Sequence, residues 1–257
     1  MTDGARTPPG DRGRRLPQPL PPLPDQPLLS VVMPVHNERD TLPRIVAMVR
    51  AVPFTKELVI VDDGSDDESR AQLDRIATLP DVRLLRHPRR RGKGAALRTG
   101  FAAVRGDLVV VQDADLEYDP ADFAALLAPL RDGRADVVYG SRYLVEDADP
   151  TRGRDTFVHY LGNRLLTFVS NLCTGLNLTD METCYKCMRR EVVDAVDVQS
   201  RGFAVEPELT AKLARLPVRI WEVPIRYRGR GYADGKKIGV LDAFAAVATI
   251  VRFVVQR

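Results

Sequence analysis

Cysteine is scarce in this sequence of 257 residues, which holds only three. A small, odd number in a chain of this length argues against a disulfide framework and for a reducing compartment. Cys184 and Cys187 have the spacing of a redox or zinc pair, but no second pair and no histidine cluster accompanies them. We therefore expect packed thiols rather than a metal or redox centre.

Long apolar runs are also lacking. No stretch reaches the roughly 18 to 20 uninterrupted apolar residues that a spanning helix needs, and the best candidate, residues 240–255, is broken by Asp242 and Arg252. The N-terminus lacks the apolar core of a signal peptide. These absences predict a cytoplasmic protein, with peripheral contact to the inner face of the membrane as the alternative.

The excess of charge of one sign is small, because the formal net charge is +3. This value is too low to indicate nucleic acid as a partner. Hydrophobic residues make up 44% of the chain, which is enough for a sizeable core. Residues 1–27 differ, since they hold eight of the nineteen prolines and few large apolar side chains. This composition predicts a disordered or polyproline-like arm, followed by one domain over residues 28–257.

From residue 28 onward, short apolar runs alternate with helical stretches. Such alternation predicts an α/β fold with a mostly parallel central sheet flanked by helices. The second half is more mixed, with helices expected at 157–172, after Pro207 and at the C-terminus. Strands are expected at 28–33, 57–61, 82–86, 108–112, 136–139, 185–189 and 218–223.

Three polar clusters follow predicted strands, at the carboxyl ends where open α/β sheets bind their ligands. Asp113 and Asp115, in the third cluster, are one residue apart, so both carboxylates can point to the same side of extended backbone. Two such charges repel unless a cation intervenes, and Mg²⁺ typically takes one or two protein carboxylates plus phosphate oxygens. The pattern predicts a divalent metal that holds a diphosphate. The clusters are Pro34-Val-His36-Asn-Glu38, Asp62-Asp63-Gly-Ser-Asp66 and Asp113-Ala114-Asp115-Leu-Glu117.

Two other phosphate-binding motifs are missing. A dinucleotide site needs Gly-x-Gly-x-x-Gly after the first strand, where this chain has Pro34-Val-His36. A P-loop needs Gly-Lys-Ser/Thr, but Lys93 is followed by Gly94. Neither a Rossmann cofactor site nor a P-loop is therefore expected.

Together with Gly92-Lys-Gly-Ala-Ala-Leu-Arg98 and Gly140-Ser-Arg142, the three clusters resemble the motifs of family 2 glycosyltransferases. This resemblance covers the chain from residue 28 to its C-terminus. It implies the GT-A fold, a Rossmann-like nucleotide-diphospho-sugar transferase fold, with a donor half (28–142) and an acceptor half (143–257). It also implies a UDP- or GDP-hexose donor and Mg²⁺ or Mn²⁺ on Asp113, Asp115 and Glu117. The implied nucleotide-sugar contacts are Pro34, His36, Glu38, Asp62, Asp63, Lys93, Arg98, Asp113 and Ala114.

Three later motifs narrow the resemblance to polyprenyl-phosphate (dolichyl-phosphate) mannose and glucose synthases. They are Gly140-Ser-Arg142-Tyr, Glu222-Val-Pro-Ile225 and Arg230-Gly-Tyr-Ala-Asp-Gly-Lys236. In those enzymes, the cations that correspond to Arg142, Arg230 and Lys236 gather the acceptor and donor phosphates. With Asp115 and Glu206 they form the catalytic set expected here. The stretch from Asp180 to Lys186 departs from the commoner Asp-x-x-Ser/Cys-Gly-Phe pattern, which leaves the acceptor open.

The acceptor decides which residues the reaction needs. A polyprenyl phosphate is largely ionised at neutral pH, since its second pKa is about 6. Such an acceptor needs cations rather than a base. Direct displacement by it would invert the anomeric centre. A saccharide or small-molecule hydroxyl would need a carboxylate base, for which Glu182, Glu206 and Glu208 are candidates. A non-catalytic nucleotide-sugar-binding protein is a third possibility, which the intact Asp113-x-Asp115 pair disfavours.

A lipid acceptor would also require contact with a membrane. The stretches 157–169 and 240–253 both have aromatic and aliphatic faces. Helices of this type can lie in the membrane interface or form part of an ordinary core. The sequence leaves both roles open.

Overall fold

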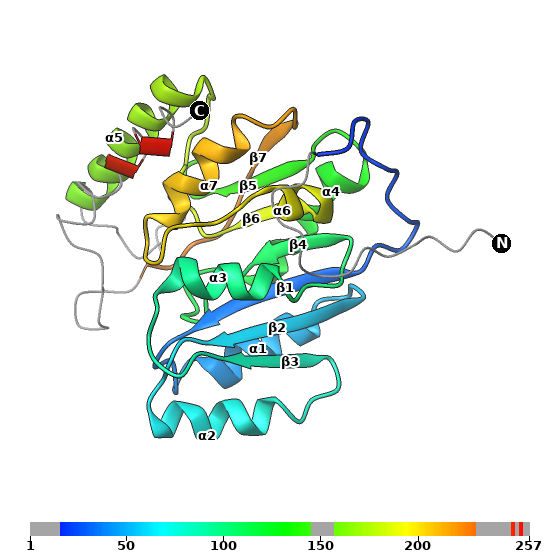
Figure 1. Ribbon diagram of the computed structural model, residues 1–257, viewed down its shortest axis with the longest axis vertical. Helices are drawn as coiled ribbons and strands as arrows, with labels where there is room; N and C mark the ends of the chain where they lie inside the picture. The colour runs from blue at the N-terminus through cyan, green and yellow to red at the C-terminus, as the bar shows by residue number, and fades with distance from the viewer. Residues whose placement is uncertain (1–15, 145–156, 230–247, 250–251, 254–257) are drawn as a thin grey trace.

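A seven-stranded sheet forms the centre of the computed structural model, which describes residues 16–144, 157–229, 248–249 and 252–253. The strand order is β3-β2-β1-β4-β6-β5-β7, and Figure 1 shows the strands side by side. All neighbours pair in parallel except β6, which is antiparallel to both β4 and β5. The expected α/β class with a mostly parallel sheet is therefore confirmed. The strands are β1 (Leu29–Val35), β2 (Lys56–Asp62), β3 (Val82–Arg86), β4 (Leu108–Val111), β5 (Val137–Ser141), β6 (Lys186–Arg189) and β7 (Ile220–Pro224).

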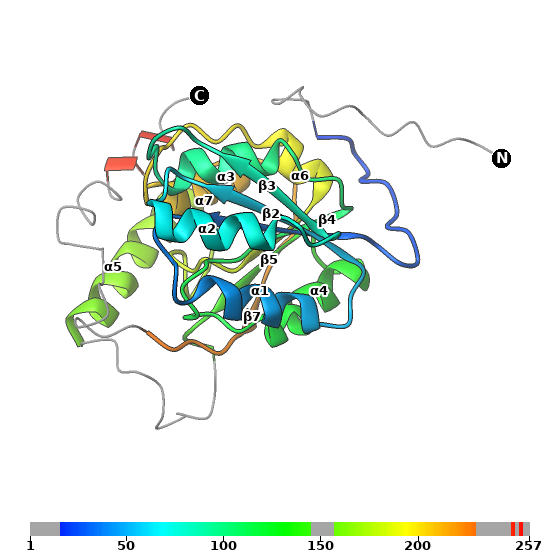
Figure 2. The ribbon, with the colours of Figure 1, turned by 90° about the horizontal axis from the view of Figure 1, so that it is seen from below.

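Helices cover both faces of this sheet. Figure 2 shows α3, α6 and α7 on one face and α1 and α4 on the other. The long helix α5 stands apart from both layers and packs against α7. The short α6 was not expected from the sequence. The helices are α1 (Leu42–Ala51), α2 (Asp67–Ile76), α3 (Lys93–Phe101), α4 (Phe123–Arg131), α5 (Phe157–Thr174), α6 (Arg190–Ala195) and α7 (Val205–Leu213).

The central strands are buried on both faces, which explains their unbroken apolar runs. Every residue of Leu58–Val61 and of β4 is 0–1% exposed, as expected where helices cover both sides of a parallel sheet. The same burial leaves polar side chains of these strands only at their ends. The candidate catalytic residues therefore gather where the strands stop.

The second half of the expected arm is ordered against the fold. Leu16, Leu20 and Leu23 pack on the hydrophobic core, Gln18 donates to the Pro217 carbonyl over 3.1 Å, and Arg189 donates to the Pro21 carbonyl. Part of the expected arm, residues 16–27, therefore contacts the fold without forming a helix or strand of its own. Three leucines in eight residues suffice for docking, because the interspersed prolines leave less chain entropy to lose. Residues 1–15 lie outside the described part of the chain.

None of the helices within the described ranges is long and apolar enough to cross a bilayer.

Removal of the docked segment should destabilise the fold. Deleting residues 1–25 exposes the surface that the three leucines cover, at a cost of about 2 to 4 kcal/mol, and should lower Tm by about 4 to 16 °C. Deleting residues 1–15, a stretch with Met1 as its sole large apolar residue, serves as the control and should change Tm much less. Thermal unfolding followed by circular dichroism measures both. Equal Tm values for the two truncations would contradict the docking.

Candidate active site

The loops after β1 and β2 are joined at the carboxyl edge of the sheet. Asn37 takes up a left-handed backbone conformation with φ of 56°, and its side chain accepts a hydrogen bond from the Asp66 N–H over 2.9 Å. In return, the Asn37 N–H donates to Ser65 Oγ over 3.2 Å. The structure thus brings the first two polar clusters, with His36 and Glu38 in the first, into one continuous surface.

The two adjacent aspartates after β2 have different surroundings. Asp63 is buried, and its carboxylate binds the His87 ring and accepts from the N–H groups of Arg91 and Gly92. These bonds fasten the β3–α3 loop to the end of β2. The Asp62 carboxylate accepts from the N–H of Ser65 over 2.9 Å. Asp63 therefore builds the loop that carries Lys93, whereas Asp62 shapes the turn after its own strand.

Glycine is required where this loop meets its neighbours. Gly92 has φ of 95°, and a Cβ there would lie 2.3 Å from the Arg201 carbonyl oxygen. At Gly64, with φ of 71°, a Cβ would lie 2.5 Å from backbone atoms of the β3–α3 loop. No other residue type fits without moving backbone. These contacts hold Lys93, at the first turn of α3, over the sheet edge.

A network of buried charges connects both halves of the chain. Lys93 Nζ lies 2.9 Å from Asp113 Oδ2 and 3.1 Å from Glu206 Oε1. On its other oxygen, Glu206 accepts from the fully buried Lys186. Lys186 also donates to the carbonyls of Met181 and Thr183. Two carboxylates and two lysines thus alternate along the network, and they come in turn from the end of β4, α3, α7 and β6.

The network keeps Lys93 charged. Burial by itself would lower the pKa of Lys93, but the neighbouring carboxylates of Asp113 and Glu206 raise it well above the ordinary value. The Cys184 thiol interacts with Lys93 and Asp113. Burial is the main cause that raises the pKa of this thiol, and the negative charge of Asp113 raises it further. Cys184 is therefore a packed neutral thiol, in line with the expectation for the cysteines.

The Asp-x-Asp segment forms a tight turn after β4. Leu116 has φ of 67°, and the Glu117 N–H donates to Asp115 Oδ1 over 3.1 Å. The Glu117 carboxylate accepts from the Tyr227 hydroxyl over 2.9 Å. Asp113, by contrast, is held by Lys93. The three acids expected to bind metal thus have separate polar contacts.

The chemistry of this turn suits a hard divalent ion. No group of three or more His, Cys, Asp or Glu side chains that could hold a metal occurs among the described residues. Asp113 and Asp115 are two carboxylates on one turn, and Mg²⁺ commonly takes one or two carboxylates and completes its shell with substrate phosphates. The residues therefore fit an ion bound together with a diphosphate. They do not form a closed cage of three protein acids.

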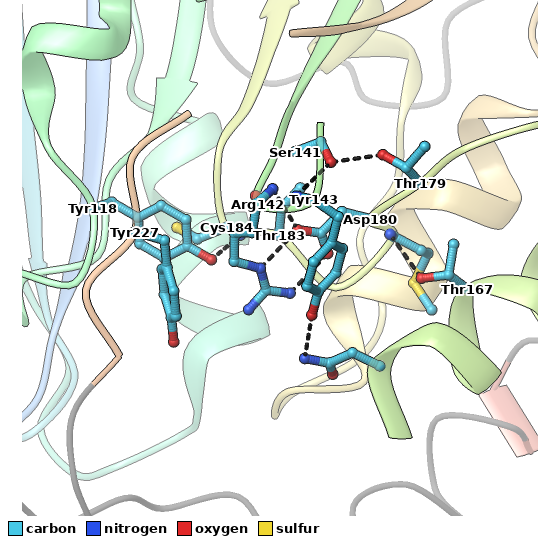
Figure 3. Close-up of polar contacts among 12 residues, drawn as sticks. Tyr118, Ser141, Arg142, Tyr143, Thr167, Thr179, Asp180, Thr183, Cys184 and Tyr227 are labelled. Atoms are coloured by element: carbon cyan, nitrogen blue, oxygen red, sulfur yellow. Dashed lines mark hydrogen bonds and ion pairs between the residues drawn. The ribbon is translucent and has the colours of Figure 1, made fainter. Parts of the chain in front are cut away.

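Arg142 is fixed at the end of β5 by Asp180 (Figure 3). Its Nε and Nη2 each donate to the Asp180 carboxylate over 2.7 Å, and its N–H donates over 3.0 Å. Asp180 is itself positioned by Glu222 of β7, which accepts from the N–H groups of Thr179 and Asp180. Because the pair uses Nε and Nη2, Nη1 points away from Asp180. Arg142 is thus a buried, preorganised cation rather than a partner of a surface carboxylate.

Aromatic rings flank this guanidinium. Its central carbon lies 5.6 Å from the ring centre of Tyr143 and 5.1 Å from that of Tyr227. Tyr227 also donates to Glu117, so the same ring connects Arg142 with the Asp-x-Asp turn. The cation and the carboxylate turn therefore belong to one site.

Glu182 lies in the same loop and has unusual titration behaviour. Burial raises its pKa to about 7, with a further contribution from the Glu206 carboxylate. Its Oε1 atom is buried with no hydrogen-bond partner among the described residues. A carboxyl group with a pKa near neutrality is suited to proton transfer. Of the three glutamates considered as bases, this one has the chemistry for it.

The other two glutamates serve different purposes. Glu206 bridges two lysines, and Glu208 accepts from the N–H groups of Gln199 and Ser200 and pairs with Lys212. Both carboxylates are thus engaged in contacts that stabilise the fold. Glu206 was expected in the catalytic set, but the structure gives it a bridging position.

The remaining expected site residues lie in different surroundings. Arg98 lies further along α3 and donates to the Val198 carbonyl over 3.2 Å. Ala114 is buried at the Asp-x-Asp turn, and Pro34 is partly buried within β1. Arg230 and Lys236 lie outside the described residues.

The sequence patterns assigned no role to Asp180, Lys186, Glu222 or the two tyrosines beside Arg142. The departure from the commoner motif gave no signal for the first two, because Asp180 matches its first position and Lys186 lies beyond its last. Lys186 is buried here and needs a buried acid, which Glu206 supplies. The pairing joins residues 20 apart in sequence, so no local pattern could reveal it.

Comparisons with known proteins agree with this geometry. The family model described as Glycosyl transferase family 2 matches residues 30–197. The undecaprenyl-phosphate mannosyltransferase of Micrococcus luteus is 30% identical over 84% of this chain and 90% of its own length. The polyprenol monophosphomannose synthase of Mycolicibacterium smegmatis is 31% identical over 81% and 80%. The undecaprenyl-phosphate 4-deoxy-4-formamido-L-arabinose transferase of Proteus mirabilis is 30% identical over 81% of this chain, but this spans only 62% of that protein.

Solved structures confirm the GT-A fold. Glucosyl-3-phosphoglycerate synthase from Mycobacterium tuberculosis, in complex with Mn²⁺, UDP and phosphoglyceric acid, has a TM-score of 0.65 at 22% identity. The match covers 89% of this chain and 79% of that one. The same enzyme with Mg²⁺ and UDP gives a TM-score of 0.64. At this identity the likeness establishes the fold alone.

The buried lysine allows a test of the charge network. Lys186→Met keeps the apolar volume but removes one of the two cations on Glu206. The free energy of unfolding should fall by about 3 kcal/mol, since breaking a buried ion pair is strongly destabilising. Lys186→Met combined with Glu206→Gln should recover part of this loss. Urea unfolding measures all variants. A single variant as stable as the wild type would show that the bridge is not needed for folding.

Proposed function

The chain belongs to glycosyl transferase family 2, and from this premise we propose that it moves a hexose from UDP or GDP to a polyprenyl phosphate lipid with inversion of the anomeric centre. The observation that carries the proposal is the buried Arg142, held by Asp180 and connected through Tyr227 to the Asp-x-Asp turn. Relatives named as undecaprenyl- or polyprenol-phosphate transferases add support. As a member of this family, the chain is an enzyme of the glycosyltransferase class.

The donor is proposed to lie along the carboxyl edge of β1, β2 and β4. The base and ribose would contact the first two clusters, which the Asn37 contacts join into one surface. Asp113 and Asp115 would hold Mg²⁺ or Mn²⁺ together with the diphosphate, and Lys93 would lie beside the ion at Asp113. The bound ion would supply positive charge that stabilises the departing nucleoside diphosphate. This division keeps residues 28–142 as the donor half and 143–257 as the acceptor half.

The acceptor phosphate is proposed to bind Nη1 of Arg142. A phosphomonoester with a second pKa of about 6 is mostly a dianion at neutral pH, so no base is needed for its attack. The electrostatic repulsion between this dianion and the donor diphosphate must instead be offset by fixed cations. Arg142 is already oriented, so little reorganisation accompanies binding. Arg230 and Lys236 are proposed as further cations at this position, and the protein would work from the cytoplasm at the inner face of the membrane.

One observation favours a second candidate function, transfer to a hydroxyl. A hydroxyl must lose its proton during attack, and Glu182, with its pKa near 7 and a buried oxygen, could accept it. The cations would then act mainly on the leaving diphosphate. The two candidates make opposite demands on Glu182 and Arg142.

Substitution of the carboxylate turn tests the donor side. Asp115→Ala should lower product formation by at least about a hundredfold, since the loss of a metal ligand removes several kcal/mol of charge stabilisation. Asp113→Ala should also be severely impaired. The assay follows lipid-linked sugar formed from a panel of nucleotide sugars, a short polyprenyl phosphate and Mg²⁺ or Mn²⁺. Asp132→Ala, an exposed acid paired with Arg134, is the control. Near wild-type turnover of Asp115→Ala at saturating Mn²⁺ would contradict the assignment of Asp115 as a metal ligand.

The acceptor class is decided by Arg142 and Glu182. With a phosphate acceptor, Arg142→Lys should lose about ten- to hundredfold in rate, as each charged hydrogen bond contributes about 1.5 to 3 kcal/mol. Arg230→Ala and Lys236→Ala should behave similarly, whereas Glu182→Gln should stay active. With a hydroxyl acceptor, Glu182→Gln should be inactive.

The pH profile gives a second readout of the same question. The raised pKa of Glu182 means that it becomes a competent base only as pH rises through about 7. A hydroxyl reaction should therefore accelerate over that range, and Glu182→Gln should abolish the rise. An inactive Glu182→Gln beside an active Arg142→Lys would reject the lipid-phosphate proposal.

A further inference from the structure

A fully buried glutamine stands immediately before the Asp-x-Asp turn. Gln112 is 0% exposed, and its N–H donates to the Val32 carbonyl over 3.0 Å, which continues the ladder between β4 and β1. All four residues of β4 are apolar. A buried amide among such residues is costly unless its polar atoms are paired. Gln112 therefore requires partners, and those partners show what it does.

Two hydrogen bonds satisfy this amide and fix its orientation. Its Nε2 donates to the Asp113 carbonyl over 3.0 Å, and its Oε1 accepts from the Tyr185 hydroxyl over 2.7 Å. A carbonyl can only accept, so the amide turns its NH₂ group toward Asp113 and its oxygen toward Tyr185. Burial raises the pKa of Tyr185 well above its ordinary value, so the hydroxyl keeps the proton that it donates. The hydrogen bonds from Tyr185 through Gln112 to Asp113 thus run in one direction.

The residue before Tyr185 holds the far end of the same turn. The Cys184 N–H donates to the Tyr118 hydroxyl over 3.1 Å, and the ring centres of Tyr118 and Tyr185 lie 4.8 Å apart. Figure 3 shows Tyr118 beside Cys184 and Tyr227. Between the two ends, Leu116 has φ of 67°, a left-handed conformation that costs free energy in a residue other than glycine. Contacts from outside the turn must therefore hold its shape.

The hydroxyl that binds Gln112 belongs to a departure from the commoner sequence pattern. In the pattern Asp-x-x-Ser/Cys-Gly-Phe, a phenylalanine stands at the position of Tyr185. Phenylalanine offers no hydroxyl, so the oxygen of Gln112 would then be buried without a donor. The two side chains therefore depend on each other. Neither of them has a place in the donor and acceptor sites described above.

From these contacts we propose that Gln112 and Tyr185 are positioning residues for the metal-binding turn. Their hydrogen bonds orient the Asp113 peptide, and through it the carboxylate that would take the ion together with the diphosphate. Lys93 holds that carboxylate, so the backbone and the side chain of Asp113 are fixed by different contacts. Ligands that are already oriented lose little freedom when an ion binds. The inference rests on the proposed function, because it requires an ion at Asp113 and Asp115.

A pair of variants separates positioning from folding. Tyr185→Phe leaves the Gln112 oxygen buried and unpaired, so Tm should fall by about 2 to 8 °C. Gln112→Met combined with Tyr185→Phe removes both polar groups and should recover most of this loss. Asp113 is partly exposed, so water can replace the lost donor at its carbonyl. Thermal unfolding of both variants measures the effect on stability.

Binding of Mn²⁺ measures the effect on the site. Each protein is titrated with Mn²⁺ in the presence of UDP or GDP, and electron paramagnetic resonance reports the free ion against a titration without protein. The double variant should bind Mn²⁺ about three- to tenfold more weakly than the wild type, because water does not fix the Asp113 peptide as the buried amide does. Tm should thus recover in the double variant while the affinity for Mn²⁺ does not. A double variant with the affinity of the wild type would overturn the inference.

Tyr139→Phe is the matched control. The Tyr139 hydroxyl is also buried, and it bonds to Thr210 Oγ1 over 3.0 Å in the contact between β5 and α7. This variant should lose stability and keep the wild-type affinity for Mn²⁺. Equal weakening of Mn²⁺ binding by Tyr139→Phe and by the double variant would show that the affinity follows stability, which would also overturn the positioning role.

The same titration separates the inference from the proposed function. A wild type that binds no Mn²⁺ with either nucleotide would overturn both the metal site and the positioning role. Weaker Mn²⁺ binding by the double variant, together with a wild type that transfers no sugar to polyprenyl phosphate, would reject the proposed acceptor and support the positioning role.

Discussion

The carboxylate of Glu206 lies buried between Lys93 and Lys186, and the arrangement of the site depends on this bridge. A buried acid is costly unless cations pair with it, and each buried lysine needs an acid in turn. Lys93 comes from the first half of the chain and Lys186 from the second. The two halves must therefore pack in one register for these charges to be compensated. The Asp-x-Asp turn joins the same network through Asp113, which couples the proposed metal site to the packing between the halves.

The loop between Asp180 and Lys186 is held from both ends. Glu222 binds its first N–H groups, and the Lys186 ammonium binds the carbonyls of Met181 and Thr183. Each end also serves the site, since Asp180 orients Arg142 and Lys186 compensates Glu206. The shape of this loop thus has a physical basis in side-chain contacts from β6 and β7. The raised pKa of Glu182 is a consequence, because the same loop buries that carboxyl near another acid.

The position of α5 connects the site with its surroundings. Its inward side binds the loop that carries Asp180 through amides and hydroxyls, and its exposed apolar side chains lie on the opposite side. Helix α5, the aromatic rings beside Arg142 and the guanidinium itself are therefore parts of one packed arrangement.

The sequence by itself determined the α/β class, the family and most element positions, because apolar periodicity and strand-end motifs are local properties. It also predicted that three polar clusters would meet at one edge, since parallel strands end together. Tertiary structure decided the rest. The antiparallel direction of β6, the Lys186–Glu206 pair and the docking of Leu16, Leu20 and Leu23 depend on contacts between distant segments. The outward rotation of α5 was undecided for the same reason: its sequence fits a core helix or an interfacial one, and only the polar contacts with Tyr143 and Met181 set which side faces out.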